Sequence, residues 1–295
     1  MQDRMIKCLA YGGKVNIKCI NSTNLVEAAR KIHDLSPVTT AALGRLLTMA
    51  SLMGSNLKEN DDEITLQIKS NGPIDTMIVV SNKNGDVKGY IKNPNIDIPL
   101  KDDGKLDVGT AVGKDGMLYI IKDIGLKEPY VGLTPLVSGE IAEDFTQYFA
   151  KSEQIPTAIA LGVLVDKNGV KSAGGYIVQL MPDATDEDIT KLEETLKNIA
   201  PISRLLEEQK SLEEIAELLS GDDKLIILGD DINPIYKCDC SRKRMEDGLI
   251  SLGKTELEDI INTDEKAEII CRFCKEKYNF TKGDLQKLKE ECKKS

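Results

Sequence analysis

The sequence predicts an α+β protein with an N-terminal mixed α/β domain, built of antiparallel sheets around a buried central helix, then a helical linker and a small C-terminal domain with a group of four closely spaced cysteines. Strand-like segments in the first part of the chain pair around short turns that contain glycine, which indicates hairpins. A long, almost uncharged helical pattern lies between the first two of these pairs, and four of the seven cysteines lie within residues 238–274. We therefore expect the core domain at residues 1–181, the linker at 182–231 and the C-terminal domain at 232–295.

The strands of the core domain are expected as four hairpins. The members of each pair are rich in β-branched and other apolar residues, and a turn sequence separates them. The expected pairs are 5–10 with 14–20, 64–70 with 74–82, 106–113 with 117–124, and 155–166 with 170–181.

Three helices are expected within this domain. Residues 24–35 are helical in pattern, and Ser36-Pro37 then supplies an N-cap and a first-turn proline for the next helix. Only Arg45 is ionised in this second helix before Lys58, and several of its residues are small, so we expect it to be buried on several sides and to form the centre of the core. The third helix, at 139–154, carries one apolar face formed by Ile141, Phe145, Tyr148 and Phe149.

The linker is expected to contain two amphipathic helices. Thr185 with Asp188 and Ser211 with Glu214 have the spacing of capping boxes, and Gly221 ends the second helix. Both apolar stripes need a surface to cover them, which we expect to be the sheet of the core domain. The stripes consist of Ile189, Leu192, Leu196 and Ile199 in the first helix, and of Leu212, Ile215, Leu218 and Leu219 in the second.

The negative charge of the protein is concentrated in the linker. The whole chain has a net charge of −10, and residues 183–231 alone contain 15 acids and 5 bases. Such a field disfavours general binding to nucleic acids. The pairs Glu193-Glu194, Glu207-Glu208 and Glu213-Glu214 place like charges side by side, which leads to the hypothesis that the linker is docked but weakly held.

Four cysteines of the C-terminal domain have the spacing of a metal site. They occur as Cys238-Asp239-Cys240 and as Cys271-Arg272-Phe273-Cys274, in a chain without a secretion signal. Four thiolates favour zinc, and few apolar residues are available in this domain to form a core without a metal. We therefore expect residues 232–295 to be a zinc-binding domain that holds one ion in the reduced state.

The same four thiols are also candidates for redox chemistry. Neighbouring thiols oxidise most readily, so the pairs Cys238 with Cys240 and Cys271 with Cys274 would form disulfides and expel the metal. Basic residues around them are expected to offset the charge of the thiolates and to keep released thiols reactive. These residues are Arg242, Lys243, Arg244, Arg272, Lys275 and Lys277.

Two other functions fit parts of this pattern. CRFC is a CxxC motif, as in thiol oxidoreductases, but those enzymes carry it at the start of a helix within a βαβ unit. SRKR and KEK beside the cysteines are compatible with a nucleic-acid-binding zinc module, against which the charge of the linker argues. A static, purely structural zinc site is a third possibility.

No other part of the chain indicates a catalytic site, so we expect a protein that is not an enzyme. Phosphate-binding and dinucleotide-binding motifs are absent from the sequence, and so are an apolar stretch long enough to span a membrane and a signal peptide, which predicts a cytoplasmic protein. His33 is the one histidine and is expected to be structural. We expect Cys8 and Cys19 to be buried and inert, and Cys292 to be exposed without a role.

Several long segments carry a family resemblance that extends over essentially the whole chain. The sequence resembles the redox-regulated heat-shock holdases, the 33 kDa chaperonins. The segments are CDCSRKRM and CRFCKEKYNF near the end, and SPVTTAALGRLLTMASLMGSNLK, GKLDVGTAVG, VSGEIAEDFTQYFAKSEQIP and AGGYIVQLMP in the core domain.

This resemblance implies a chaperone of the stress response that needs no ATP and is inactive while zinc is held by Cys238, Cys240, Cys271 and Cys274. In the family, peroxide or hypochlorite, usually with heat, forms two disulfides between neighbouring cysteines, releases zinc, unfolds the tail and destabilises the linker. The resemblance further implies that the active form captures unfolding client proteins, is often a homodimer and passes clients to ATP-dependent foldase chaperones, with no nucleic acid or membrane as partner. No motif marks residues that contact clients, so we assign that role only to the linker and the apolar surface beneath it.

Overall fold

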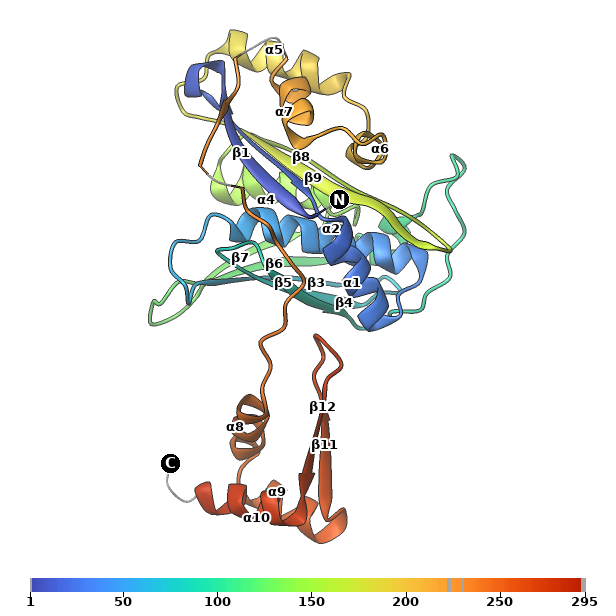
Figure 1. The fold of residues 1–295 in the computed structure, drawn as a ribbon, viewed down its shortest axis with the longest axis vertical. Helices are drawn as coiled ribbons and strands as arrows, with labels where there is room; N and C mark the ends of the chain where they lie inside the picture. Colours follow the sequence, from blue (N-terminus) through green and yellow to red (C-terminus); the bar gives the residue numbers. More distant parts are fainter. Residues whose placement is uncertain (1, 222–223, 230, 293–295) are drawn as a thin grey trace. The chain divides into compact units, whose positions relative to one another are not determined.

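The computed structural model describes residues 2–221, 224–229 and 231–292. The chain forms two compact units, Met1–Lys237 and Cys238–Ser295 (Figure 1). Antiparallel sheets and helices make up the described part of both units, which confirms the expected α+β class.

The first unit is built on two five-stranded antiparallel sheets. Sheet A has the strand order β10-β1-β2-β9-β8, and sheet B has the order β5-β4-β3-β6-β7. The strands of sheet A are β1 (Arg4–Ala10), β2 (Val15–Asn21), β8 (Thr157–Asp166), β9 (Gly169–Leu180) and β10 (Ile226–Ile227). Those of sheet B are β3 (Glu63–Ser70), β4 (Thr76–Asn82), β5 (Val87–Ile91), β6 (Gly116–Asp123) and β7 (Tyr130–Pro135).

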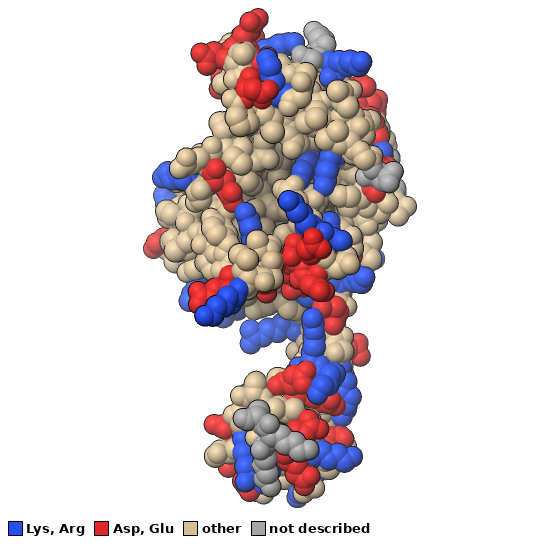
Figure 2. Space-filling model, turned by 90° about the vertical axis from the view of Figure 1, so that its left-hand side faces the viewer, with Lys and Arg blue, Asp and Glu red and all other residues tan. Residues whose placement is uncertain are grey.

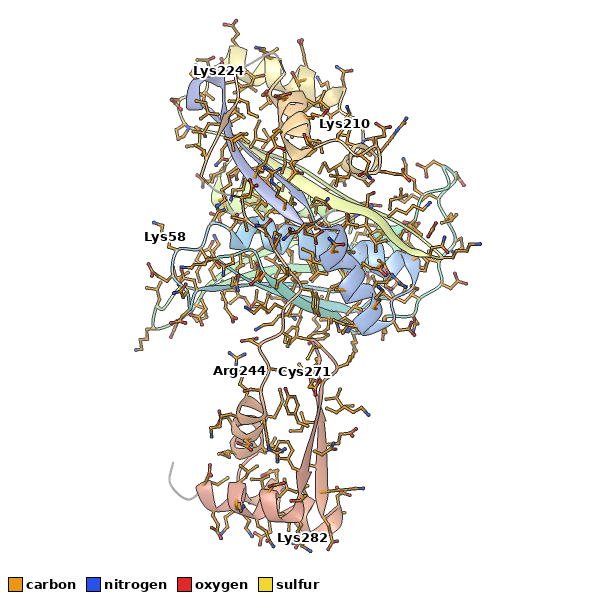
Figure 3. All side chains as sticks on the ribbon, viewed as in Figure 1. Lys58, Lys210, Lys224, Arg244, Cys271 and Lys282 are labelled. Atoms are coloured by element: carbon orange, nitrogen blue, oxygen red, sulfur yellow. The ribbon has the colours of Figure 1, made fainter. Side chains whose placement is uncertain are left out.

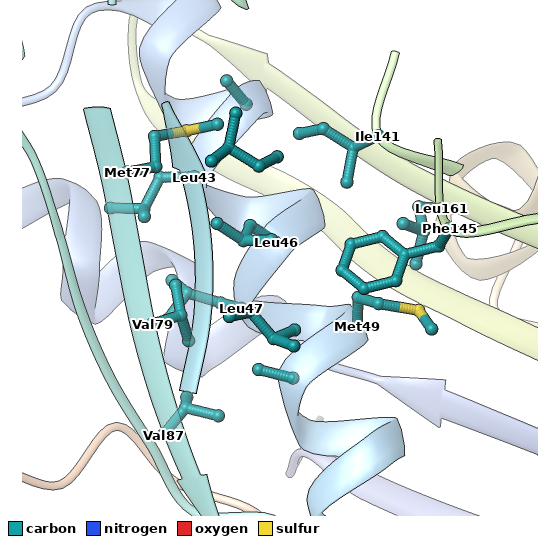
Figure 4. Close-up of a cluster of buried hydrophobic side chains, with 14 of the residues drawn as sticks. Leu43, Leu46, Leu47, Met49, Met77, Val79, Val87, Ile141, Phe145 and Leu161 are labelled. Atoms are coloured by element: carbon teal, nitrogen blue, oxygen red, sulfur yellow. The ribbon is translucent and has the colours of Figure 1, made fainter. Parts of the chain in front are cut away.

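Helix α2 (Pro37–Gly54) lies between the two sheets and forms the centre of the core, as expected. All of its residues except Pro37 and Arg45 are buried, and the Arg45 guanidinium is 2.6 Å from the Glu140 carboxylate. Gly44 is required by this packing, because a Cβ there would lie 2.7 Å from Cγ1 of Val26 in helix α1 (Thr23–His33). Figure 4 shows leucines of α2 against side chains of sheet B on one side and against Phe145 and Leu161 on the other.

The third helical segment also forms as expected. Helix α4 (Ala142–Tyr148) continues into a π-helical turn, Phe149–Glu153. The side chains of Ile141, Phe145, Tyr148 and Phe149 are all buried.

The expected strand at 106–113 is wrong. This segment contains a short helix, α3 (Val108–Val112), because the Asp107 side chain accepts a hydrogen bond from the Thr110 backbone N–H at 3.0 Å and so caps a helical turn. Strand β6 pairs instead with β3 and with β7, a strand that the sequence analysis missed.

The linker helices cover the face of sheet A that points away from α2. They are α5 (Asp186–Lys197), α6 (Ile202–Glu207) and α7 (Leu212–Ser220). The predicted capping boxes are present at Thr185 and Ser211, whereas α6 was not predicted, and Leu218 is 41% exposed although we placed it on the apolar stripe. The buried apolar side chains of the three helices form one cluster with those of β1, β2 and β9: Leu192, Ile202, Leu205, Leu206, Leu212, Ile215, Ala216 and Leu219.

Several linker acids have partners, which contradicts part of the hypothesis of a linker weakened by repulsion. Glu213 accepts hydrogen bonds from both terminal nitrogens of the Arg4 guanidinium, and these bonds hold the pKa of Glu213 below its usual range. Backbone and side-chain bonds from Ser211 likewise lower the pKa of Glu214. Asp188 is held by its bonds to the Thr185 backbone, to Lys14 and to the Thr185 hydroxyl, which lower its pKa to about 2. These carboxylates stabilise the docked linker in their charged form.

In the view of Figure 2, acidic and basic side chains lie next to one another over the uppermost part of the first unit, where the linker helices are. The broad area below them on this face is mostly uncharged.

Residues 232–237 belong to the first unit, although we expected the C-terminal domain to begin at residue 232. Ile232 exchanges two backbone hydrogen bonds with Met5, and the Tyr236 hydroxyl donates to the Gly89 carbonyl at 2.7 Å. The second unit therefore begins at Cys238.

Within the described residues, no helix has both the length and the apolar character that crossing a membrane requires.

The pairing of Glu213 with Arg4 predicts that two acids of the linker respond differently to loss of their charge. Glu213→Gln removes the charged partner of Arg4 and should destabilise docking of α7 by about 0.5 to 1 kcal/mol at pH 7, the range of a partly exposed ion pair. Glu194→Gln, at an exposed position of α5, should have no destabilising effect. Amide hydrogen exchange of α7 in the reduced protein measures both.

The pH dependence of these variants tests whether the charge of Glu213 causes the effect. The pKa of Glu213 is lowered in the folded protein, so its contribution is present above the ordinary value of 4.5 and is lost as the pH falls through the lowered value. The difference between Glu213→Gln and the parent protein should therefore shrink as the pH falls below 4.5. Equal exchange rates in the parent and in Glu213→Gln at pH 7 would contradict a stabilising role for this carboxylate.

Candidate metal centre

Four cysteines of the second unit come together at one place. Cys238 and Cys240 lie directly before helix α8 (Arg242–Leu252), and Cys271 and Cys274 lie in the turn between strands β11 (Lys266–Ile270) and β12 (Lys277–Thr281). Their Sγ atoms all lie within 4.8 Å of one another. Figure 3 shows Cys271 at one end of the β11–β12 hairpin and Lys282 at the opposite end.

The sulfurs lie about as close together as the ligands of a tetrahedral metal site. Cys238 Sγ is 3.7 Å from Cys271 Sγ, and Cys240 Sγ is 3.3 Å from Cys274 Sγ. Sulfurs at the Zn–S distance of about 2.3 Å would be about 3.8 Å apart in a regular tetrahedron. Four soft ligands in this arrangement could hold one zinc ion without a further ligand.

Local structure fixes each pair of cysteines. The Ser241 hydroxyl caps α8 by accepting a hydrogen bond from the Arg244 backbone N–H at 3.3 Å, which sets the direction of the chain just after Cys240. The turn at the end of the β11–β12 hairpin is closed by two bonds, from Cys271 N–H to the Glu276 carbonyl and from Lys275 N–H to the Cys271 carbonyl, both 2.9 Å. Lys275 has a φ of 63°, so the chain reverses there in a left-handed conformation.

The four thiols differ in their surroundings. Cys271 is 5% exposed, and the other three are half-buried. Burial raises the pKa of Cys238 well above the usual range and that of Cys274 to about 11. Burial also opposes ionisation of Cys240, but hydrogen bonds from the Tyr278 hydroxyl, at 3.1 Å, and from the other thiols outweigh it and lower its pKa. Sequence reasoning missed Tyr278, which the β11–β12 pairing brings to this sulfur.

The second unit has a small core of its own. Six buried apolar side chains contributed by α8, α9 (Lys254–Thr263), β12 and α10 (Lys282–Glu291) pack together, and the Arg242 guanidinium lies 4.4 Å from the centre of the Phe280 ring. Such a core is small, and units of this size commonly depend on a metal or on disulfides for stability. The core residues are Leu249, Leu257, Ile261, Phe280, Leu285 and Leu288.

The basic residues near the cysteines are largely engaged with carboxylates, which differs from the expected role of offsetting thiolate charge. Arg242 pairs with Glu246 and Asp284. Three further pairs are Lys243 with Asp247, Arg244 with Asp239, and Lys277 with Glu268.

The remaining cysteines and the histidine lie outside this centre. Cys8 and Cys19 are fully buried in sheet A, and burial raises the pKa of the Cys8 thiol to about 11 and that of the Cys19 thiol well above its usual range. His33 is buried, with Nε2 at 3.1 Å from the Tyr236 hydroxyl. Cys292 is half-buried against the small core of the second unit, so the expectation of an exposed residue is wrong.

The family model, the sequence relatives and a solved structure that match this chain all belong to one family. The family described as Hsp33 protein matches residues 3–281. Proteins named 33 kDa chaperonin from Clostridium botulinum and Bacillus cereus are 50% and 44% identical over 98% of this chain, and the match covers 98% and 99% of their own lengths. The crystal structure of the 33 kDa chaperonin from Thermotoga maritima, a heat shock protein 33 homolog, superimposes with a TM-score of 0.92 at 37% identity over 100% of both chains.

The geometry of the four thiols predicts how substitutions affect metal binding. Cys271→Ser removes the most buried sulfur of the cluster, so we expect it to weaken zinc binding at least tenfold and to loosen the second unit under reducing conditions. Cys292→Ser is the matched control, because it removes a half-buried thiol of the same unit outside the cluster. Zinc competition with a chromogenic chelator measures the affinity, and near-wild-type affinity in Cys271→Ser would contradict the ligand assignment.

Proposed function

The chain belongs to the Hsp33 family, and from this premise we propose that it is a redox-regulated, ATP-independent holdase that is inactive while reduced and zinc-bound. Its relatives are named chaperonins, which is the name of a chaperone and not of an enzyme. In this proposal residues 1–181 form the core, 182–231 are a releasable linker, and 232–295 contain the redox switch. The observation that carries the proposal is the cluster of four thiols in a unit with only a small apolar core.

The proposed ligands in the reduced state are Cys238, Cys240, Cys271 and Cys274. Zinc, when bound, would keep all four sulfurs as thiolates and contribute folding free energy to the second unit. The hairpin turn and the capped start of α8 hold the sulfurs close enough to act together. Because the small core must otherwise sustain the unit alone, loss of the thiolate ligands is expected to unfold it.

Oxidation by peroxide would convert these ligands into two disulfides. A thiolate sulfur attacks one peroxide oxygen, the O–O bond breaks, hydroxide leaves, and the cysteine becomes a sulfenic acid. The neighbouring thiol sulfur then displaces the sulfenic oxygen, which leaves as water, and an S–S bond forms. Two peroxide molecules thus take four electrons and produce the pairs Cys238 with Cys240 and Cys271 with Cys274.

Release of the linker would uncover an apolar surface for clients. Helices α5, α6 and α7 bury their apolar side chains against β1, β2 and β9, so undocking would expose both sides of this contact. We propose that unfolding client proteins bind there and are later passed to ATP-dependent foldase chaperones. We further propose that the protein acts in the cytoplasm and is a homodimer when active.

Neither alternative function gains support from the site. The CxxC motif lies in the turn of a two-stranded hairpin, whereas dithiol oxidoreductases place it at the start of a helix. Several of the basic residues near the cysteines are paired with carboxylates, which reduces the positive field that nucleic-acid binding would require.

The proposal predicts that chaperone activity appears only after zinc release. We would compare the reduced, zinc-loaded protein with peroxide-treated protein in a light-scattering assay of a thermally aggregating client, while a chromogenic chelator reports free zinc. Suppression of aggregation should rise in step with zinc release and should reverse on reduction with zinc present. Equal activity of the reduced protein, or zinc release without a gain in suppression, would mean that the metal site is only structural.

A further inference from the structure

The outer edge of strand β1 is covered by an extended segment of the same chain. β10 pairs with β1 in antiparallel register, with Ile227 opposite Cys8 and Ile226 opposite Leu9. The Leu228 N–H donates to the Lys7 carbonyl at 2.7 Å. Farther along, Ile232 exchanges two backbone bonds with Met5, at 2.7 and 3.1 Å. In Figure 1 this part of the chain, drawn in orange, runs beside the blue strand β1.

Residues 226–228 of the covering segment are held mainly through their backbone. Ile226 and Ile227 are each 48% exposed, and Leu228 is 39% exposed. Their side chains therefore contribute far less burial than those of α6 and α7, whose apolar residues lie in the cluster on sheet A. An extended apolar segment bound through main-chain groups places few demands on side-chain identity.

One side chain of β1 ties this segment to the linker helices. The Arg4 guanidinium donates two hydrogen bonds to Asp231, with Nη2 at 2.9 Å from Oδ1, and it also binds Glu213 of α7. The chain then continues through Tyr236 and Lys237 directly into Cys238. The segment that covers β1 and the first cysteine of the cluster, Cys238, therefore belong to one continuous stretch of chain.

We propose that the outer edge of β1 is a binding site for extended apolar segments of unfolding proteins, which add to sheet A as an antiparallel strand. In the resting protein Ile226, Ile227, Leu228 and Ile232 occupy this edge as an internal stand-in for such a segment. This inference rests on the proposed holdase function and adds to it a mode of client recognition. It commits to client segments as the occupant because the present occupant is itself an extended apolar stretch and pairs with β1 through main-chain hydrogen bonds. An uncovered edge would expose the N–H and C=O groups of β1, which readily pair with another strand.

A peptide with the sequence of residues 224–236 tests this inference on the full-length protein. We expect the fluorescein-labelled peptide to bind the peroxide-activated chain at least tenfold more tightly than the reduced, zinc-loaded chain, as measured by fluorescence anisotropy. It should also displace a bound client. A methyl group on the Leu228 nitrogen removes the N–H that donates to Lys7 and should weaken binding about tenfold or more.

The matched control carries the methyl group on the Ile227 nitrogen. Ile227 lies opposite Cys8, next to the hydrogen-bonded position of Leu228, and these positions alternate along an antiparallel pair, so its N–H points away from β1. This control peptide should bind like the unmodified one. Equal binding of the two methylated peptides would overturn the inference, because it would indicate apolar adhesion without strand pairing.

Proline substitutions in the full chain give a second test that does not use oxidation. Leu228→Pro removes the donor to Lys7 and should allow the reduced protein to bind the peptide while it retains zinc. Ile227→Pro removes an N–H that does not face β1. It should leave β10 paired with β1, so that the reduced protein does not bind the peptide. If Leu228→Pro instead forms a dimer that excludes the peptide, the edge of β1 binds a second copy of the chain, and the proposal that it binds client segments is wrong.

The outcomes separate this inference from the proposed function. If the oxidised protein suppresses client aggregation but neither binds the peptide nor releases clients to it, the edge site is wrong and the holdase function stands. If the oxidised protein fails to suppress aggregation at all, the proposed function fails, whatever the peptide does.

Discussion

Sheet A is apolar on both faces, and each face has to be covered. Strand β9 is buried without interruption from Ser172 to Val178, a pattern that differs from the alternation of a sheet with one solvated face. Alternate residues of the strands point to opposite faces. Helix α2 covers one face together with sheet B, and the linker helices cover the other. The two covering elements are packed differently: α2 lies between two sheets, whereas the linker helices lie on the outside of one sheet.

This difference makes the linker the part that can leave with the least disruption of the core. Removal of α2 would open the packing between both sheets, where Phe145 and Tyr148 are fully buried. Removal of the linker would leave that packing in place and expose one face of sheet A. The linker is nevertheless anchored in the resting protein, since its apolar side chains pack on sheet A and Arg4 binds Glu213 of α7. Its release therefore needs a cause from outside the linker, and the cysteine cluster of the second unit is the proposed source.

The second unit is suited to trigger release of the linker because its stability has two sources, an apolar core and four sulfur atoms that could hold a metal. Its apolar core is small, and its four sulfurs converge from segments that are distant in sequence. A core of that size can be sustained by metal coordination, and coordination by sulfur is lost when sulfur is oxidised. A chemical change at a few atoms can thus alter the fold of a whole unit, and this unit continues directly from the chain that covers β1.

The sequence by itself determined the features that depend on near neighbours along the chain. Three of the four expected hairpins, the buried helix α2, the capping boxes at Thr185 and Ser211 and the two cysteine pairs follow local patterns, and the structure has them. Only the tertiary structure decided which residues far apart in sequence meet. Arg4 reaches Glu213 across most of the chain, and Tyr278 reaches Cys240 because β11 and β12 pair. The segment 106–113 has strand-like composition, but the Asp107 cap favours a helix there. Charge patterns were the least reliable guide, because the sign of a carboxylate's contribution depends on the partner that the fold brings to it.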